Sequence, residues 1–166
     1  MCKGLSSLPA SCLERAKGMR VKLTHLADKQ EWSLHHKHRI LENKAHLDLE
    51  SLLCSKIGQR AFRGFLQSEF SEENLEFWLS CEEYKTTPAG LQGVKAQTIY
   101  TRFIHPGAPQ EVNLDAETRE AVLRALEEPN SDLFHKAQQH AYNLMAKDSY
   151  RRFLRSPHCF EALRAH

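Results

Sequence analysis

Apolar residues recur at helical spacing along the chain after position 47, and no alternating run of strand length interrupts them. The clearest stripe consists of Phe134, Ala137, Gln138, Ala141, Leu144 and Met145. Such spacing places side chains on one face of an α-helix. Breaks that contain proline and glycine, at 86–90 and 106–109, separate stripes of the same period. The sequence therefore predicts an all-α body whose helices pack by their apolar faces.

Short polar residues stand where two of these helices are expected to begin. Ser71 precedes a helix that carries Leu75 and Phe77, and Asp115 precedes another. Serine and aspartate accept hydrogen bonds from the unsatisfied N–H groups of a first helical turn, so both are predicted to be N-caps. We assign the large aromatic residues of the stripes to the core and not to a ligand pocket: Phe65, Trp78, Phe103 and Phe134.

Residues 1–30 form a separate amphipathic segment. Their apolar residues are spaced by three or four: Leu5, Leu8, Cys12, Ala16, Met19, Leu23 and Leu26. Residues 1–45 hold nine Lys and Arg against four Asp and Glu, a net charge of +5, whereas the rest of the chain holds 14 against 17, a net charge of −3. We therefore expect a basic helix over residues 1–30, a polar linker over 31–46 and an acidic domain over 47–164.

The composition disfavours several classes of function. The 166 residues contain no apolar run of the ~20 residues needed to cross a bilayer and no secretory h-region. The basic arm has a single aromatic residue, Trp32, so nucleic acid is not an expected partner. The five cysteines lack metal-ligand spacing and are interpreted as reduced thiols of a cytosolic protein. His35, His36 and His38 lack a companion cluster of ligands, so neither a metal nor another cofactor is expected.

Three separated motifs carry a family resemblance: residues 68–84, 111–115 and 147–154. In their order and spacing they resemble the domain of the regulators of G-protein signalling, the RGS family, over a match from about Leu47 to Leu163. The resemblance implies a bundle of about nine helices in two subdomains that binds the α subunit of heterotrimeric G proteins (Gα). It further implies a GTPase-activating protein for GTP-bound Gα of the Gi and Gq classes, which terminates signalling without catalytic side chains of its own.

The same resemblance implies which residues contact Gα. The positions that match the family's contact motifs are Glu69, Asn74, Asn113, Leu144, Asp148, Ser149 and Arg152. Asn113 would orient the active-site glutamine of Gα, and Asp148 would accept hydrogen bonds from a switch loop. Arg152 would brace Asp148 as an ion pair, since residues four apart meet on a helix. It is not expected to be an arginine finger, because Gα carries its catalytic arginine in cis.

Each of these residues also has a simpler structural interpretation. Asp148 and Ser149, taken alone, are explained most economically as helix caps. Asn113 alone fits a turn, and Glu69 alone fits a solvated acid. An enzyme in its own right is not expected, because the sequence has no nucleophile elbow, phosphate loop or paired carboxylates. The alternative function is a non-catalytic Gα-binding scaffold or effector antagonist, which the absence of Asn74, Asn113 and Asp148 would have favoured.

The arm resembles that of small RGS proteins, in which it is a membrane anchor. Cys2 and Cys12 match palmitoylation positions there, and Cys81 matches a domain cysteine that is acylated in some relatives. An apolar stripe with basic flanks suits an anionic inner leaflet. We therefore expect a cytoplasmic monomer, peripherally associated with the inner face of the plasma membrane through residues 1–30. Two alternatives stay open, namely an arm helix docked on the domain and a plain buried thiol at Cys81.

Overall fold

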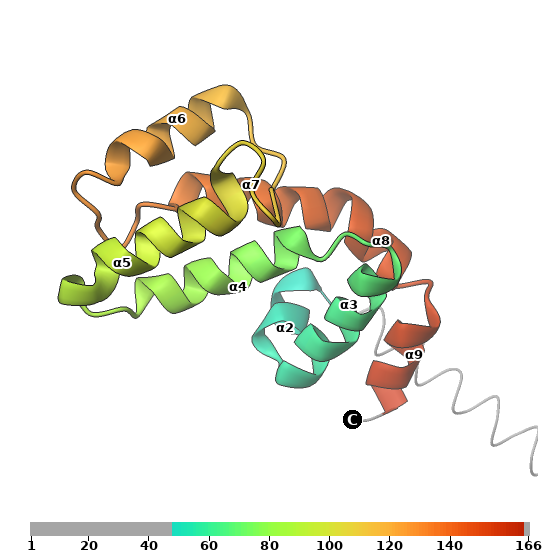
Figure 1. Cartoon of the computed structure of the whole chain (residues 1–166). Helices are drawn as coiled ribbons and strands as arrows, with labels where there is room; N and C mark the ends of the chain where they lie inside the picture. The colour runs from blue at the N-terminus through green and yellow to red at the C-terminus, as the bar shows by residue number, and fades with distance from the viewer. Residues whose placement is uncertain (1–47, 165–166) are drawn as a thin grey trace, which may run out of the picture. The chain divides into compact units, whose positions relative to one another are not determined.

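Figure 1 shows the computed structural model, which describes the backbone of residues 48–164 and the side chains of residues 48–160. The predicted arm and linker, with Cys2 and Cys12, lie outside these residues. The described part contains eight α-helices, two π-helical segments and no strand, which confirms the all-α prediction. In chain order the elements are α2 (Leu49–Cys54), α3 (Lys56–Ser68), α4 (Glu73–Lys85), α5 (Ala89–Ile99), a π-helical segment (Tyr100–Ile104), α6 (Ala116–Ala125), α7 (His135–Leu144), a second π-helical segment (Met145–Ser149), α8 (Tyr150–Phe153) and α9 (Pro157–Arg164).

Local capping explains where several of these helices begin. Asp48 accepts the Ser51 N–H at 2.6 Å, and Asp115 accepts the Thr118 N–H at 2.7 Å, so the predicted Asp115 cap is confirmed. The Ser71 prediction is wrong, because α4 begins after Glu72 without a side-chain cap. The Ser71 hydroxyl oxygen is instead buried and has no hydrogen-bond partner among residues 48–160. The tight link between α3 and α4 turns it inward, where the first N–H groups of α4 are out of its reach.

Two hydrophobic clusters divide the bundle, in agreement with the expected two subdomains. The first joins α4, α5, the first π-helical segment, α6 and α7 and is centred on buried side chains, among them Phe77, Tyr84, Ile99, Phe103, Val112, Val122 and Phe134. The second joins α2, α3, the start of α4, the second π-helical segment, α8 and α9 and is centred on Leu52, Leu53, Phe62, Phe65, Leu66, Leu75, Met145 and Phe153. The antiparallel pair α4 and α7 runs through both and connects them (Figure 1). None of the helices within 48–164 combines the length and apolarity needed to span a bilayer.

A glycine allows α2 and α3 to meet closely in the second cluster. A Cβ atom at Gly58 would lie 2.4 Å from the carbonyl oxygen of Leu52. Both residues are buried, so neither backbone can move aside without disturbing the packing around it. The short α2 is therefore held against α3 by close backbone approach as well as by Leu52 and Leu53.

The helix that begins as α7 does not stop before Asp148. Leu144, Ser149 and Tyr150 all keep right-handed helical backbone angles, so α7, the second π-helical segment and α8 follow one another without a break. Ser149 makes no capping hydrogen bond. Met145 and Phe153 are fully buried on either side of this stretch, and their burial keeps the chain helical. The interpretation of Asp148 and Ser149 as helix caps is therefore wrong.

Candidate functional site

Arg152 on α8 connects the first sequence motif with the third. Its Nη2 lies 2.8 Å from Oε2 of Glu69, and its Nε lies 3.0 Å from Oε1 of the same carboxylate. Its Nη1 also donates to Oδ1 of Asp148, which confirms the predicted ion pair on the helix. Glu69 is the C-cap residue of α3, so one guanidinium holds two helices together. Hydrogen bonds to Glu69 and then to Asp148 raise the pKa of Arg152 further above its usual value.

The α3–α4 junction presents an aromatic residue that the sequence analysis passed over. The N–H of Phe70 donates to the carbonyl of Gln67, and the N–H of Ser71 donates to that of Leu66. This is a Schellman motif, whose central position usually holds glycine because its backbone is left-handed. Phe70 occupies that position at φ 52° with a side chain that is 93% exposed. The available signal was an aromatic residue between Glu69 and Ser71 that belongs to no helical stripe.

Asn74, the second residue of α4, lies at the same junction and has a side-chain oxygen without a hydrogen bond in the described part of the chain. In the part of the chain that the structure describes, its side-chain oxygen is buried without a hydrogen-bond partner, as is the hydroxyl of Ser71 three residues earlier. A buried polar atom with no partner costs ~1–3 kcal/mol. The junction therefore contains unused hydrogen-bonding capacity as well as a strained backbone at Phe70.

Asn113 lies in the non-helical segment between the first π-helical segment and α6. Its neighbours Val112 and Leu114 are 0% and 6% exposed and point into the first cluster, so Asn113 between them points outward. Its side chain makes no hydrogen bond with the residues that the structure describes. A turn residue would bond its own backbone, so the interpretation of Asn113 as turn chemistry has no support in the structure.

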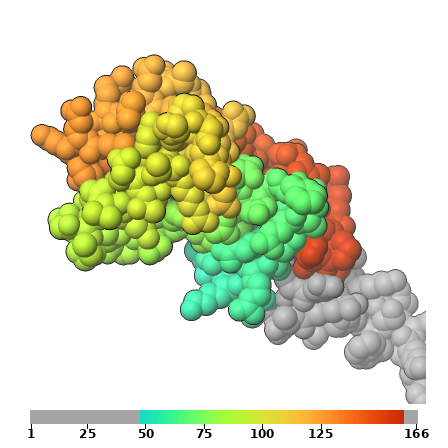
Figure 2. Space-filling model, viewed as in Figure 1, coloured from blue at the N-terminus to red at the C-terminus, as the bar shows by residue number. Residues whose placement is uncertain are grey.

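A hollow of about 280 Å³ brings the first two motifs together. On one side the α3–α4 junction lines the hollow with Phe70, Glu72 and Glu73. On the other side the 105–115 segment lines it with Glu111. Pro109 and Gln110 complete the wall. Figure 2 shows the yellow 105–115 segment lying directly against the green start of α4. Segments almost forty residues apart in the chain thus form one surface.

The remaining site residues lie along the α7–α8 helix. Leu144 is half-buried at the end of α7, Ser149 is 8% exposed, and Asp148 is exposed beside Arg152. The seven predicted residues therefore lie at helix ends and in one loop. They offer hydrogen-bond donors and acceptors but no nucleophile paired with a base. Within the described residues no group of three His, Cys, Asp or Glu side chains could hold a metal ion.

The face carries several acidic side chains. Glu69, Glu72, Glu73, Glu111 and Asp148 surround the junction, the hollow and the end of α7, and Arg152 is bound to two of these carboxylates. Such a surface is suited to a partner that presents N–H groups and positive charge.

Cys81 is the lipidation candidate that the structure describes. Its side chain is 1% exposed and lies in the first cluster with Phe77 and Tyr84. Burial raises the pKa of the Cys81 thiol well above its usual value, so the thiolate needed for acylation is suppressed. This environment favours the interpretation as a plain buried thiol.

The sequence of this chain is similar to one domain family and to several proteins that carry its name. The family model of the Regulator of G protein signaling domain matches residues 48–161. Regulator of G-protein signaling 5 of Sus scrofa is 43% identical over 173 residues, covering 94% of this chain and 96% of that protein. Regulator of G-protein signaling 16 of Bos taurus is 42% identical over 177 residues, covering 95% and 87%. Regulator of G-protein signaling 1 of Homo sapiens is 49% identical over 108 residues, covering 65% and 52%.

Proposed function

The chain belongs to the family of regulators of G-protein signalling, and from this premise we propose that it binds GTP-bound Gα and accelerates GTP hydrolysis. The chemistry belongs to Gα, which supplies its own arginine, glutamine and magnesium ion. This chain contributes a rigid surface that holds the switch loops of Gα in the geometry of the transition state. Preorganisation of that kind lowers the barrier without any donated catalytic group.

One observation supports the proposal more than any other. Residues from three distant motifs gather on one acidic face, joined by the Arg152 contacts to Glu69 and Asp148 and by the hollow between Phe70 and Glu111. None of the three motifs has this significance alone. Two helix ends and a loop held together can clamp two switch loops at once, whereas a single helix edge cannot.

The individual residues would have separate roles in this complex. Asn113 is exposed and makes no side-chain hydrogen bond with the described residues, so its amide can orient the glutamine of Gα that positions the attacking water. Asp148 accepts the Arg152 hydrogen bond through Oδ1, so its Oδ2 can accept N–H groups of a switch loop. Glu69, Asn74, Leu144 and Ser149 would complete the contact surface around them.

We propose the Gi and Gq classes as partners, bound by a monomer of this chain. A non-catalytic scaffold or effector antagonist is the second candidate. Such a protein would bind active Gα through the same acidic face but would leave the hydrolysis rate unchanged. The presence of Asn74, Asn113 and Asp148 favours the activator.

We further propose that residues 1–30 bind the anionic inner leaflet of the plasma membrane from the cytoplasm, with Cys2 and Cys12 as palmitoylation sites. The support is the apolar stripe with basic flanks and the net charge of +5 over residues 1–45. Each basic residue near an anionic leaflet contributes ~1 kcal/mol of attraction. Membrane attachment would concentrate the activator where lipid-anchored Gα is found.

Single-turnover hydrolysis of GTP by purified Gi and Gq α subunits, with and without this protein, tests the activator proposal. A large rise in rate is expected, because the switch loops become ordered before the chemical step. Binding to the transition-state form of Gα without any acceleration would favour the scaffold. Failure to bind either class would overturn both candidates.

A further inference from the structure

We propose that Arg119 is a positioning residue that orients the Asn113 loop, a role that rests on the proposed function of Asn113. Asn113 has no hydrogen bond of its own among the described residues, so its direction is set entirely by the backbone that carries it. The loop formed by residues 105–112 has no regular structure and contains Gly107 at φ 79°. Something outside the loop must hold it.

Backbone hydrogen bonds within this loop run from the N–H of Ala108 to the carbonyl of His105 and from the N–H of Glu111 to that of Ala108, and two others connect it to the segment before it. The N–H of Val112 donates to the carbonyl of Phe103 at 2.9 Å, and the N–H of Gln110 donates to that of Arg102 at 3.1 Å. These two hydrogen bonds hold residues 110–112 beside the end of the first π-helical segment.

Arg119 closes the loop from the other side. It lies in the second turn of α6, and its side chain is 20% exposed. Its Nη1 donates to the carbonyl oxygen of Ile104, where the loop begins, and lies 2.9 Å from Oε1 of Glu111, where the loop ends. One guanidinium nitrogen therefore ties together both ends of the loop and the helix that follows it.

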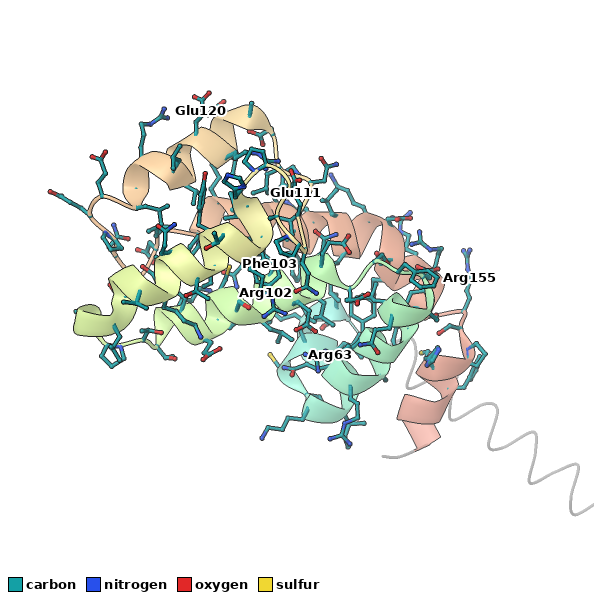
Figure 3. All side chains as sticks on the ribbon, in the orientation of Figure 1. Arg63, Arg102, Phe103, Glu111, Glu120 and Arg155 are labelled. Carbon is teal, nitrogen blue, oxygen red and sulfur yellow. The ribbon has the colours of Figure 1, made fainter. Side chains whose placement is uncertain are left out.

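Glu111 extends this connection to the tip of the loop. Its Oε2 accepts the N–H of Gly107 at 2.9 Å while its Oε1 is held by Arg119. The hydrogen bond from Gly107, followed by that from Arg119, lowers the pKa of the Glu111 carboxyl below its usual value. Figure 3 shows Glu111 beside the end of the helix that carries Arg102 and Phe103, whereas Glu120 points away from the loop on α6.

Asn113 follows Glu111 by two residues, and Val112 between them is fully buried. If Glu111 is released, the backbone bonds of Gln110 and Val112 remain, but the connection of the loop to α6 is lost, and the outward direction of Asn113 is held less firmly. A displacement of about 1 Å at a positioning group can reduce a rate by about a hundredfold. Arg119 therefore acts on the hydrolysis rate through Asn113, without touching Gα.

A double-mutant cycle separates this role from a general contribution to stability. Arg119→Gln keeps a donor but cannot bridge Ile104 and Glu111, and we expect it to lower the maximal accelerated rate at saturating protein by about tenfold or more. In an Asn113→Ala background the same substitution should have almost no further effect on that rate. Its effect on thermal unfolding should be equal in the two backgrounds.

Arg124→Gln is the matched control, since Arg124 lies on the same helix and pairs at 3.5 Å with Glu120, both being largely exposed. It should leave the rate unchanged. Hydrogen exchange of the Val112 amide in the full chain gives a second readout that needs no Gα. Faster exchange in Arg119→Gln than in Arg124→Gln is expected.

Equal rate losses from Arg119→Gln with and without Asn113, or unchanged Val112 exchange, would overturn the positioning role. Failure of the proposed function gives a different pattern, in which the unmodified protein does not accelerate hydrolysis at all while Val112 exchange still responds to Arg119. The two failures are therefore distinguishable.

Discussion

Arg152 and Glu69 are separated by 83 residues in the sequence, yet two nitrogen atoms of the arginine contact the two carboxylate oxygens of the glutamate. The contact joins the end of α3 to α8, and the same guanidinium holds Asp148. Because lysine is a point donor and cannot reproduce a planar fork, the arrangement depends on arginine specifically.

Arg152→Lys should therefore reduce the acceleration of GTP hydrolysis by about tenfold or more while leaving the domain folded. The side chain of Arg152 is 43% exposed, so solvent screens the pair and the free energy of unfolding should change by less than about 1 kcal/mol. Single-turnover rates and urea unfolding measure the two effects. Arg151→Lys, on the neighbouring exposed cation, is the control, and equal rate losses in the two variants would contradict the prediction.

Asn113→Ala should lower the maximal accelerated rate by about tenfold or more. Its side chain is exposed and has no hydrogen bond to any residue that the structure describes, so the free energy of unfolding should stay within about 0.5 kcal/mol. Circular dichroism melting and single-turnover hydrolysis check this split. Gln97→Ala removes an exposed amide from α5 and should affect neither quantity. A loss of helicity that matches the loss of activity would show that Asn113 is structural.

Phe70→Gly should stabilise the domain and at the same time weaken its binding to Gα. Glycine adopts the left-handed conformation at φ 52° without strain, and the Phe70 ring gives up almost no burial because it is 93% exposed. Relief of backbone strain is worth ~1 kcal/mol. Phe70→Ala removes the ring but keeps the strain, so it should lose binding without gaining stability. Binding to Gα by calorimetry, with thermal melts, separates the two variants.

Asp115→Asn should make the domain less sensitive to acid. Hydrogen bonds from the N–H and then the hydroxyl of Thr118 lower the pKa of Asp115 from its usual 3.8. Its ionised form therefore stabilises the fold fully above the unfolded pKa, and this stabilisation is lost as the pH falls through the lower folded value. Urea midpoints at about pH 7, 5 and 3 should show a difference between the two proteins that is smaller at the lowest pH. A difference independent of pH would contradict the assignment.

Deletion of residues 1–30 should abolish co-sedimentation with anionic vesicles, because those residues contain most of the basic charge of the arm. Binding of the full chain should also weaken as salt is raised, since screening shortens the range of surface charge. Vesicles of neutral lipid are the control. Undiminished binding of the deletion variant would refute the membrane role of the arm.

The amino-acid sequence by itself determined the helices, the core and the local contacts. Periodic spacing is a property of neighbouring residues, so the burial of Phe65, Phe103 and Phe134 could be predicted without knowledge of the topology. The Asp115 cap and the Asp148–Arg152 pair depend on separations of three and four residues, which a helix brings together wherever it lies.

Only the tertiary structure decided how the motifs meet. Helix packing sets the distance between the segments that form each of the long-range contacts. These are the Glu69–Arg152 ion pair, the hollow between Phe70 and Glu111, and the hydrogen bond from Arg119 to Glu111 in the 105–112 loop. Because Met145 and Phe153 are buried, the helix continues from α7 through Asp148 and Ser149. The capping preference of Asp148 and Ser149 alone would have favoured the start of a new helix there. The packing of the whole domain outweighs a capping preference of ~1 kcal/mol. Packing depends on residues far apart in the chain, so it could not be predicted from the sequence around a single motif.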